Sequence, residues 1–309
     1  MPCTWATFHP NTVFGQTLYM DISIIIVTYN TKEMTAECIE SIYQKTLNCS
    51  FEVIVIDNAS KDGSQQLLSS LNYKNYQYIY NERNKGFSRA NNIASEFATG
   101  KRLFFLNSDI LFVNDVVLNL MEYVDKNPST GIIGPKFLNQ DGTHQVSCRN
   151  FPSILLGFWH FFPFLRIFLS KEANKYYQKK RDYEKKQLVD TVSAGAMMIS
   201  KQLFYQIGRF DEFSFMYAED ADICRKVRDL DLDVIYYPNA QLIHYGGQST
   251  KLNSYRAIWS YYFAFYNLYK KYYFKNFAFL IKPFFFIRAC FAVITLFFKE
   301  DKRVTWNNK

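Results

Sequence analysis

The sequence predicts an α/β fold, with a mostly parallel sheet flanked by helices, followed by a C-terminal helical segment that is aromatic and basic. Apolar runs at 22–27 and 52–56 are short and rich in β-branched residues, as buried strands are. Helix-like segments alternate with such runs, which favours an open parallel sheet. The 309 residues are 49% hydrophobic and 21% charged, and this composition excludes wholesale disorder.

The elements of the first half alternate regularly. After the second strand, Asp62-Gly63 breaks the chain before a short helical run, QQLLSSL. In chain order we expect strand 22–27, helix 32–47, strand 52–56, helix QQLLSSL, a weaker strand 76–80, a loop entering a helix in NKGFSRANNIASEFA, and strand 103–106.

The middle of the chain differs in character. Residues 151–169 are aromatic and apolar but are broken by two prolines, and residues 171–186 carry seven basic and three acidic side chains. This pattern predicts an amphipathic excursion rather than sheet core. After it, VDTVSAGAMMIS predicts one strand, a helix begins near Asp220, and DVIYYP predicts a last strand before a loop.

The tail from Lys251 to Lys309 is strongly basic. It carries 11 basic and 2 acidic residues, a net charge of +9, whereas the whole chain has +8. Such a tail indicates an anionic partner, and because no nucleic-acid motif accompanies it we expect a membrane surface and no nucleic acid. Its aromatic residues recur at the spacing of one helical face: Tyr255, Trp259, Tyr262, Tyr266, Tyr269 and Tyr273.

The apolar stretch 277–298 is interrupted by Lys282, Pro283 and Arg288. Its longest charge-free run, ACFAVITLFF, is too short to span a bilayer, which takes about 20 apolar residues. We therefore expect the tail helices to lie in the interface of an anionic membrane, with basic residues toward the headgroups. The alternative is that the aromatic stripe packs on the preceding domain.

The N-terminal residues lack the basic start and apolar core of a secretory signal. Six scattered cysteines, with no CxxC pair and no metal-ligand spacing, are typical of free thiols in a reducing compartment. We expect a peripheral protein on the cytoplasmic side.

Polar clusters follow three of the predicted strands, and ligands of open α/β sheets bind at the carboxyl ends of strands. Asp109 suits a divalent cation held against a phosphate, or it caps the next helix. Asp57 is placed to accept from the N3–H of a pyrimidine base, or to form an Asx-turn. The clusters are Thr28-Tyr29-Asn30, Asp57-Asn58 and Asn107-Ser108-Asp109.

Glu219 and Asp220 begin a predicted helix, whose dipole favours both anions and would keep a base ionised, although these residues alone favour plain capping, shared with Asp222. His244 follows a strand and is either a ligand for an ion such as Mn²⁺ or a structural histidine. Gly246 and Gly247 would let backbone amides approach a pyrophosphate. No GxGxxG, GxxxxGK[ST], GxSxG or HExxH motif occurs where it could act, which disfavours hydride transfer, P-loop hydrolysis and serine hydrolysis.

Taken in order, these pieces resemble the inverting family 2 glycosyltransferases of the GT-A (Rossmann-like) fold, and most closely the rhamnosyltransferase-like branch that builds bacterial surface polysaccharides. The resemblance covers roughly residues 21 to 275 and rests on six runs in the same order and spacing. The runs are ISIIIVTYN, VIVIDNASKDGS, NKGFSRANNIA, FLNSD, VSAGAMMISKQLFYQIGRFDEFSFMYAEDADICRKVR and IHYGGQST.

The resemblance implies a role for each matched residue. Asp220 corresponds to the catalytic base and Glu219 to the residue that positions the acceptor. Asp109 corresponds to the last aspartate of the DxD-type motif, and His244 to the histidine that completes the coordination of Mn²⁺ or Mg²⁺. The expected contacts to the nucleotide-sugar are Thr28, Tyr29, Asn30, Asp57, Asn58, Asn84, Gly86, Asn92, Asn107, Ser108, Gly246 and Gly247.

The function that the resemblance implies is inverting, metal-dependent transfer from a dTDP- or UDP-sugar, with L-rhamnose as the candidate sugar. The expected acceptor is a saccharide or lipid-linked saccharide at the cytoplasmic face of the inner membrane. Single displacement needs a base and a Lewis acid but no covalent nucleophile. The chain departs from the pattern at Asn107, where the first carboxylate of the motif is missing, and this bears on metal affinity and identity. Ala94 and Asp231 stand where relatives often have glycine.

Two other functions stay open. An inactive nucleotide-binding scaffold of the same fold is suggested by the missing carboxylate, but the other matched acidic residues and His244 are retained. A sugar-phosphate nucleotidyltransferase would need a Gly-rich basic loop after the first strand, where this chain has TYNTKE. We expect an N-terminal extension at 1–20, a GT-A glycosyltransferase domain at 21–254 and C-terminal interface helices at 255–309.

Overall fold

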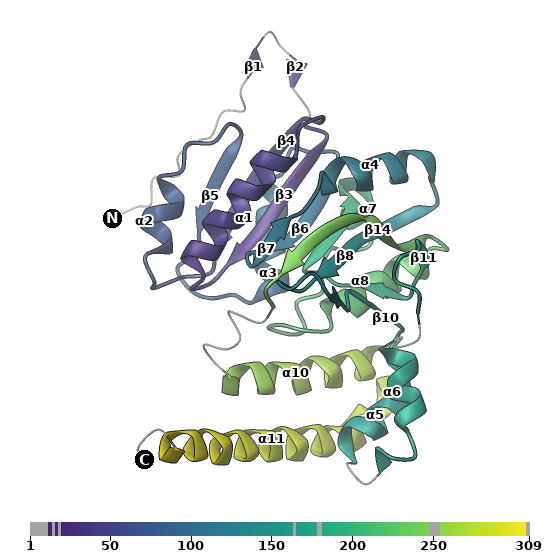
Figure 1. Cartoon of the computed structure of the whole chain (residues 1–309). Helices are drawn as coiled ribbons and strands as arrows, with labels where there is room; N and C mark the ends of the chain where they lie inside the picture. Colours follow the sequence, from purple (N-terminus) through teal and green to yellow (C-terminus); the bar gives the residue numbers. More distant parts are fainter. Residues whose placement is uncertain are drawn as a thin grey trace.

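The structure is a computed structural model, and Figure 1 shows its arrangement. The expected N-terminal extension lies mostly outside the described residues. Its described part includes two short strands, β1 (Thr12–Val13) and β2 (Gln16–Thr17), which pair with each other. The residues that the structure describes are 12–13, 16–17, 20–162, 165–177, 181–246 and 254–306.

A ten-stranded mixed sheet forms the centre of the molecule. Its main path runs β11-β14-β8-β13-β6-β3-β4-β5, with β7 beside β14 and β9 beside β8. The strands are β3 (Ile22–Thr28), β4 (Phe51–Asp57), β5 (Tyr76–Tyr80), β6 (Arg102–Asn107), β7 (Ile110–Phe112), β8 (Thr130–Leu138), β9 (His144–Gln145), β11 (Gln187–Leu188), β13 (Ala196–Ser200) and β14 (Asp233–His244).

Strand direction divides the sheet. The strands β5, β4, β3 and β6 pair in parallel, as their alternation with helices predicted, and β8 pairs in parallel with β14. Between these two parts, β13 runs antiparallel to both β6 and β8. The predicted α/β fold is therefore confirmed, with a reversed strand at its centre and short antiparallel strands at β7, β9 and β11.

Helices cover both faces of the sheet, and each face has its own core. One core includes Ile39 of α1 and Leu120 of α4, and the other includes Ala90 of α3 and Val227 of α8, all fully buried. The near-continuous apolar runs of the parallel strands follow from this burial on both faces. The helices are α1 (Lys32–Lys45), α2 (Ser64–Ser69), α3 (Phe87–Phe97), α4 (Val116–Lys126), α7 (Lys201–Gln206) and α8 (Glu219–Arg228).

Two predicted strands differ from the observed ones. VDTVSAGAMMIS splits into β12 (Thr191–Val192) and β13, because the chain turns where Ser193 Oγ accepts a hydrogen bond from Gly195 N. The strand predicted as DVIYYP continues to His244 through an irregularity in register after Tyr237. The strand β8 was not predicted, because its run TGIIGPKFL contains residues that usually interrupt strands.

After β14 the chain forms a helical hairpin below the α/β body, with α10 nearer to the sheet than α11 (Figure 1). The amphipathic excursion becomes α5 and α6 beside one end of this hairpin. The elements are α5 (Ile154–Phe161), α6 (Ser170–Tyr176), α10 (Ser254–Tyr269), a π-helical turn (Lys270–Phe274), a 3₁₀ turn (Lys275–Phe277) and α11 (Ala278–Trp306).

The aromatic stripe of α10 packs largely against α11. The ring centroid of Tyr269 lies 6.0 Å from that of Phe285, and both side chains are buried. The other face of α10, with Ala264 and Leu268, packs on Ala218 at the start of α8. The stripe therefore packs on α11 and also on the preceding domain, where the hydroxyls of Tyr269 and Tyr273 donate to Ser153 O and Pro152 O.

By length and composition, the helical stretch Tyr255–Leu296 is long and apolar enough to cross a membrane. The charge-free run of ten residues underestimates the length of the apolar helix, because the helix continues through Lys282 and Pro283. Interfacial placement of the tail stays a prediction.

A buried carboxylate ties the hairpin to α8. Asp222 is fully buried, and its Oδ1 accepts hydrogen bonds from Lys271 Nζ at 2.5 Å and Tyr272 Oη at 2.7 Å. Its Oδ2 lies 3.2 Å from Lys226 Nζ. Because a buried charge needs partners, the tail and the helix depend on each other at this point.

We expect Asp222→Asn to lower the free energy of unfolding by about 2 kcal/mol, because it removes the counter-charge of Lys226 and one of the two carboxylates that pair with Lys271, the other being Asp211. Urea denaturation of the full chain measures this. The control is Asp229→Asn, on the same helix, whose ion pair with Arg225 is exposed and contributes less than about 0.5 kcal/mol. Equal effects of the two changes would contradict the anchoring role.

Candidate functional site

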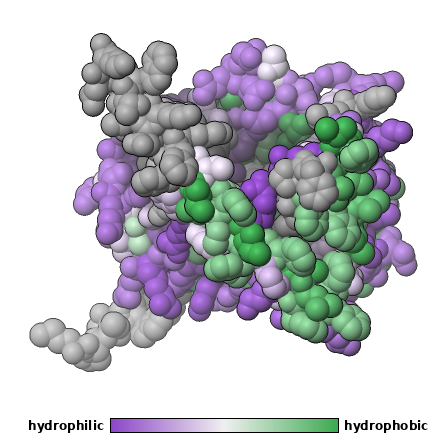
Figure 2. Space-filling model, turned by 90° about the horizontal axis from the view of Figure 1, so that it is seen from below, coloured by the Kyte–Doolittle hydropathy of each residue, from purple (hydrophilic) through white to green (hydrophobic). Residues whose placement is uncertain are grey.

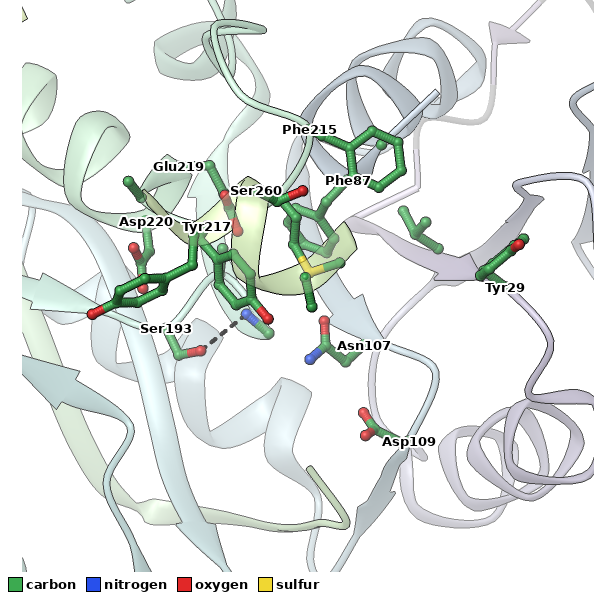
Figure 3. A pocket seen from close by; sticks show the side chains of 18 of the residues that line it. Tyr29, Phe87, Asn107, Asp109, Ser193, Phe215, Tyr217, Glu219, Asp220 and Ser260 are labelled. Atoms are coloured by element: carbon green, nitrogen blue, oxygen red, sulfur yellow. Dashed lines mark hydrogen bonds between the residues drawn. The ribbon is translucent and has the colours of Figure 1, made fainter. Parts of the chain in front are cut away.

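A pocket of about 430 Å³ lies where the carboxyl ends of β3, β4 and β6 meet α8 and α10, a size typical of small-molecule sites. Figure 3 shows Asp109 and Tyr29 on one side and Glu219 and Asp220 on the other. The predicted site residues that line it are Tyr29, Asn58, Asn84, Gly86, Asn107, Ser108, Asp109, Glu219, Asp220 and His244.

Asp109 and His244 come together as predicted. His244 Nε2 lies 3.3 Å from Asp109 Oδ1 and 3.2 Å from Asn107 Nδ2. The antiparallel pairing of β7 with β14 sets Ile110 opposite His244 and so brings Asp109 close to His244. Gln145 Oε1 lies 2.5 Å from His244 Nδ1. The Nε2 of Gln145 donates to His244 O, and this second bond fixes the orientation of the Gln145 side-chain amide.

This pair fits a divalent cation. Gln145 Oε1 accepts from the Nδ1–H of His244, so the lone pair of Nε2 is directed toward Asp109, as in metal sites whose histidines are held by an outer hydrogen bond. Carboxylate and imidazole both suit Mn²⁺, and Mg²⁺ is commonly held by one or two carboxylates together with phosphates. Within the described part of the chain no group of three or more acidic, histidine or cysteine side chains gathers, so the protein would supply two ligands.

Gly86 brings two loops into contact at the pocket wall. Asn84 Oδ1 accepts from Gly86 N, and Asn58 Nδ2 donates to Gly86 O. A Cβ on Gly86 would lie 2.4 Å from the carbonyl oxygen of Phe215, which accepts from Phe87 N. With φ at +86°, the backbone also favours glycine. The fold therefore requires glycine at this position, and contact with the nucleotide-sugar stays a prediction.

Glu219 and Asp220 occupy the first turn of α8. Asp220 Oδ1 accepts from Ala221 N at 2.8 Å, and Asp220 Oδ2 lies 3.7 Å from Arg149 Nη1. Burial, together with the charge of Asp220, raises the pKa of Glu219 to about 8. Burial also raises the pKa of Asp220, and Arg149 opposes this. At both groups, burial therefore opposes the stabilisation of the anion that the helix dipole provides.

The backbone before these carboxylates is strained. Tyr217 and Ala218 both have left-handed φ angles, 76° and 64°, although neither is glycine. Such residues cost about 1–3 kcal/mol each and persist only where the surroundings enforce them. Here Ala218 is buried against α10, and the turn directs Glu219 into the pocket.

Asp57 does not line the pocket. It is fully buried, with Oδ1 accepting from Ser60 N and Oδ2 from Tyr78 Oη, both at 2.8 Å. The Asx-type turn, one of the two possibilities for this residue, is therefore present. Contact with a nucleotide base stays a prediction.

Four more predicted residues lie away from the pocket lining. Thr28 bonds to neighbouring threonine hydroxyls, Asn30 accepts from the backbone of the loop after β4, and Asn92 holds the backbone at Phe210. Gly246 lies beyond His244 outside the lining, and Gly247 falls outside the described residues. These polar side chains brace the loops that carry the lining residues.

Sequence reasoning did not identify a group of polar side chains on the wall of the pocket near Asp220. They come from the short β10 (Cys148–Arg149), the end of α6 and the inner face of α10. Nothing in the sequence marks them as functional, because four of the five lie in segments predicted as an amphipathic excursion and a membrane-interface tail. They are Arg149, Tyr176, Tyr177, Arg256 and Tyr261.

A family model described as Glycosyl transferase family 2 matches residues 23–208. The chain is 26% identical over 210 residues to the N-acetylglucosaminyl-diphospho-decaprenol L-rhamnosyltransferase of Mycobacterium tuberculosis, a match that covers 64% of the chain and 67% of that protein. It is also 26% identical over 238 residues to the dTDP-rhamnosyl transferase RfbF of Shigella flexneri, covering 75% and 72% of the two chains.

Among solved structures, the crystal structure of GalNAc-T7 with UDP, GalNAc and Mn²⁺ is similar, with a TM-score of 0.56 and 16% sequence identity. The likeness covers 74% of this chain and 44% of that one, so the chain spans less than half of its length. This likeness concerns the fold, and it agrees with the predicted GT-A architecture.

We expect Gly86→Ala to destabilise the protein by about 3 kcal/mol, since the added Cβ collides with backbone and the φ angle is unfavourable. Thermal or urea unfolding measures the change. Gly142→Ala is the matched control, because Gly142 has a similar φ of +79° but open space around its Cβ. If both variants lose the same stability, the contact with Phe215 does not matter.

Proposed function

The chain belongs to glycosyl transferase family 2, and from this premise we propose that it transfers a sugar from a nucleotide-sugar to an acceptor hydroxyl with inversion. The observation that carries the proposal is the pocket itself, which sets a candidate base opposite a candidate metal pair. Single displacement needs these two functions and no covalent nucleophile.

Asp220 acts as the general base in this proposal. Its Oδ2 accepts the proton of the acceptor hydroxyl while the acceptor oxygen attacks the anomeric carbon. The bond from that carbon to the diphosphate oxygen breaks, and the nucleoside diphosphate leaves. Asp220 is 22% exposed, toward the pocket, and its raised pKa makes it a stronger base than an ordinary aspartate. Burial and the charge of Asp220 raise the pKa of Glu219, which favours its protonated form, so Glu219 would donate a hydrogen bond to the acceptor.

Asp109 and His244 would hold Mn²⁺ or Mg²⁺ against the diphosphate of the donor. A divalent ion bound there stabilises the negative charge of the leaving diphosphate. Asn107 Nδ2 lies 3.2 Å from His244 Nε2 and would have to give up this contact when Nε2 binds the ion, so Asn107 would not replace the missing first carboxylate of the motif. The GalNAc-T7 structure, which contains Mn²⁺ and UDP, supports a divalent ion by analogy.

The donor lies along the carboxyl ends of β3, β4 and β6. Tyr29, Asn58, Asn84, Gly86 and Ser108 line this part of the pocket and would contact the nucleotide, with Asp57 behind them. The names of the two rhamnosyl transferase relatives support L-rhamnose, carried by dTDP, as the sugar.

The acceptor is a saccharide linked to a lipid through phosphate. The printed name of the mycobacterial relative, which describes a diphospho-decaprenol acceptor, supports this class. Both Arg149, beside Asp220, and Arg256, over the ring of Phe215, line the pocket, where they would face a phosphate. The enzyme would work at the cytoplasmic face of the inner membrane in polysaccharide synthesis. The proposed domain at 21–254 and the tail at 255–309 share this site.

We expect Asp220→Asn to lower glycosyl transfer about 100-fold or more, because the amide cannot accept the proton. The full chain in mild detergent is incubated with Mn²⁺, Mg²⁺ or neither and with dTDP-rhamnose, UDP-glucose, UDP-galactose, UDP-N-acetylglucosamine or GDP-mannose, and released nucleoside diphosphate is measured. Thermal stabilisation by dTDP and UDP with Mn²⁺ tests whether the variant still binds nucleotide.

Asp229→Asn, on the exposed side of the same helix, is the control and should leave transfer unchanged. A folded Asp220→Asn enzyme with full activity would exclude the proposed base. Wild-type protein that neither releases nor binds any nucleotide would favour an inactive scaffold. Pyrophosphate release from a nucleoside triphosphate and a sugar-phosphate would indicate a nucleotidyltransferase.

Arg149 should set the pH dependence of transfer. A base must be deprotonated, so activity falls as the pH drops through the pKa of Asp220, which burial has raised. Removing the cation in Arg149→Gln raises that pKa further, because Arg149 opposes the effect of burial. We expect the acid limb of kcat/KM to move to higher pH in Arg149→Gln and to return toward the wild type in Arg149→Lys. An unchanged profile would contradict this coupling.

A further inference from the structure

The face of the molecule that carries α11 exposes large apolar side chains. Figure 2 shows hydrophobic residues gathered on this face. They include Ile167 (82%), Phe168 (79%), Phe279 (66%) and Phe291 (58%). Scattered apolar residues are normal on a protein surface, but a contiguous patch from several elements marks an interaction site.

Two elements far apart in sequence form this patch. Phe162, which follows α5, has its ring centroid 5.8 Å from that of Phe284 of α11. On α11 the inward residues Ala278, Phe285 and Ala289 are buried against α10, so the outer face is left without a partner among the described residues. We call it the α5–α11 face, defined by the exposed side chains Leu155, Ile167, Phe168, Phe279, Phe286 and Phe291.

The length and burial of the tail separate this face from an ordinary core helix. Only 17% of the most apolar 18-residue window in Tyr255–Leu296 is buried inside the structure. A core helix would be buried on most of its sides. The apolar residues of this window therefore remain available to contact a partner outside the described fold.

Charge distinguishes the possible occupants. Between residues 254 and 296 the sequence holds no acidic residue and six basic ones, of which Arg256 lines the pocket and Lys271 pairs with Asp222. The other four are Lys270, Lys275, Lys282 and Arg288, and around the 165–169 turn three basic residues stand against Glu172. A second copy of the chain would bring the same positive charge to the contact. An anionic lipid surface complements it, at about 1 kcal/mol for each basic residue near the surface. Lys282, Pro283 and Arg288 inside the apolar stretch favour a helix that lies in the interface.

We infer that the α5–α11 face docks flat on an anionic lipid bilayer, with α11 in the interface and α10 as a spacer between the bilayer and the pocket. The inference rests on the proposed function for the reason to dock, since a lipid-linked acceptor stays in the membrane. One face of α10 carries Ser260 and Tyr261 into the pocket and another packs on α11. Packed helices lie about 8–10 Å apart, so the bilayer surface lies within reach of an acceptor saccharide.

Docking would also orient the chemistry. Lys271 and Tyr272 join the hairpin to Asp222, one turn after Glu219 and Asp220 on α8. A hairpin held on the bilayer therefore holds the helix that carries the candidate base.

The test is sedimentation of the full chain with vesicles of phosphatidylcholine alone or with added phosphatidylglycerol. We expect binding to the anionic vesicles that weakens as salt is raised. The variant Ile167→Gln/Phe168→Gln/Phe279→Gln/Phe291→Gln should bind at least about tenfold more weakly. Leu47→Gln/Phe97→Gln, also exposed apolar residues but outside this face, is the matched control and should bind as the wild type does. Circular dichroism and thermal unfolding check that each variant folds.

Several results would overturn the inference. Wild-type protein that ignores phosphatidylglycerol, or a four-site variant that binds unchanged, excludes docking by this face. Wild-type dimers that the four-site variant converts to monomers assign the face to self-association. Protein that resists alkaline carbonate extraction from membranes spans them instead. Nucleotide binding with Mn²⁺, measured without vesicles, tests the proposed function separately and should be equal in wild type and four-site variant.

Discussion

The parallel pairing of β3 with β4 and β6 is the constraint on which the rest of the molecule depends. The register sets Thr28 opposite Asp57, and Val27 opposite Asn107, so three strands end at the same level. The polar residues that follow them must then meet at one edge of the sheet. That edge cannot be closed by the sheet itself, so loops, α8 and α10 complete the pocket there.

Closing the pocket brings charge out of water. Glu219 and Asp220 lie behind a strained turn and under a helix of the tail, and burial raises the pKa of both. Arg149 offsets this for Asp220 alone, so two adjacent carboxyl groups in one helical turn acquire different proton affinities. Such a difference lets one group accept a proton while its neighbour donates a hydrogen bond.

The sequence carries much of the fold and one side of the site. Apolar runs such as 22–27 predict strands because their burial on both faces requires continuous hydrophobicity, and the residues at their ends predict the site edge. The strand β8 was not predicted, because Gly and Pro usually interrupt strands. In the fold, its glycines allow close contact with neighbouring side chains. Arg149 and Tyr261 escaped it as well, because only tertiary contacts bring a two-residue strand and a tail helix to one pocket.

The tail is therefore part of the site rather than an addition to it. α10 lines the pocket with Ser260 and Tyr261, and its neighbouring turn is fixed to α8 by the fully buried Asp222. A boundary at residue 254 divides the chain in sequence but crosses the pocket in space. Because the same hairpin carries the exposed apolar face, whatever holds that face also fixes the wall beside Asp220. The α10–α11 hairpin thus joins the exposed apolar face to the wall of the pocket. This connection gives the basic, aromatic tail a structural role beside the nearly neutral α/β body.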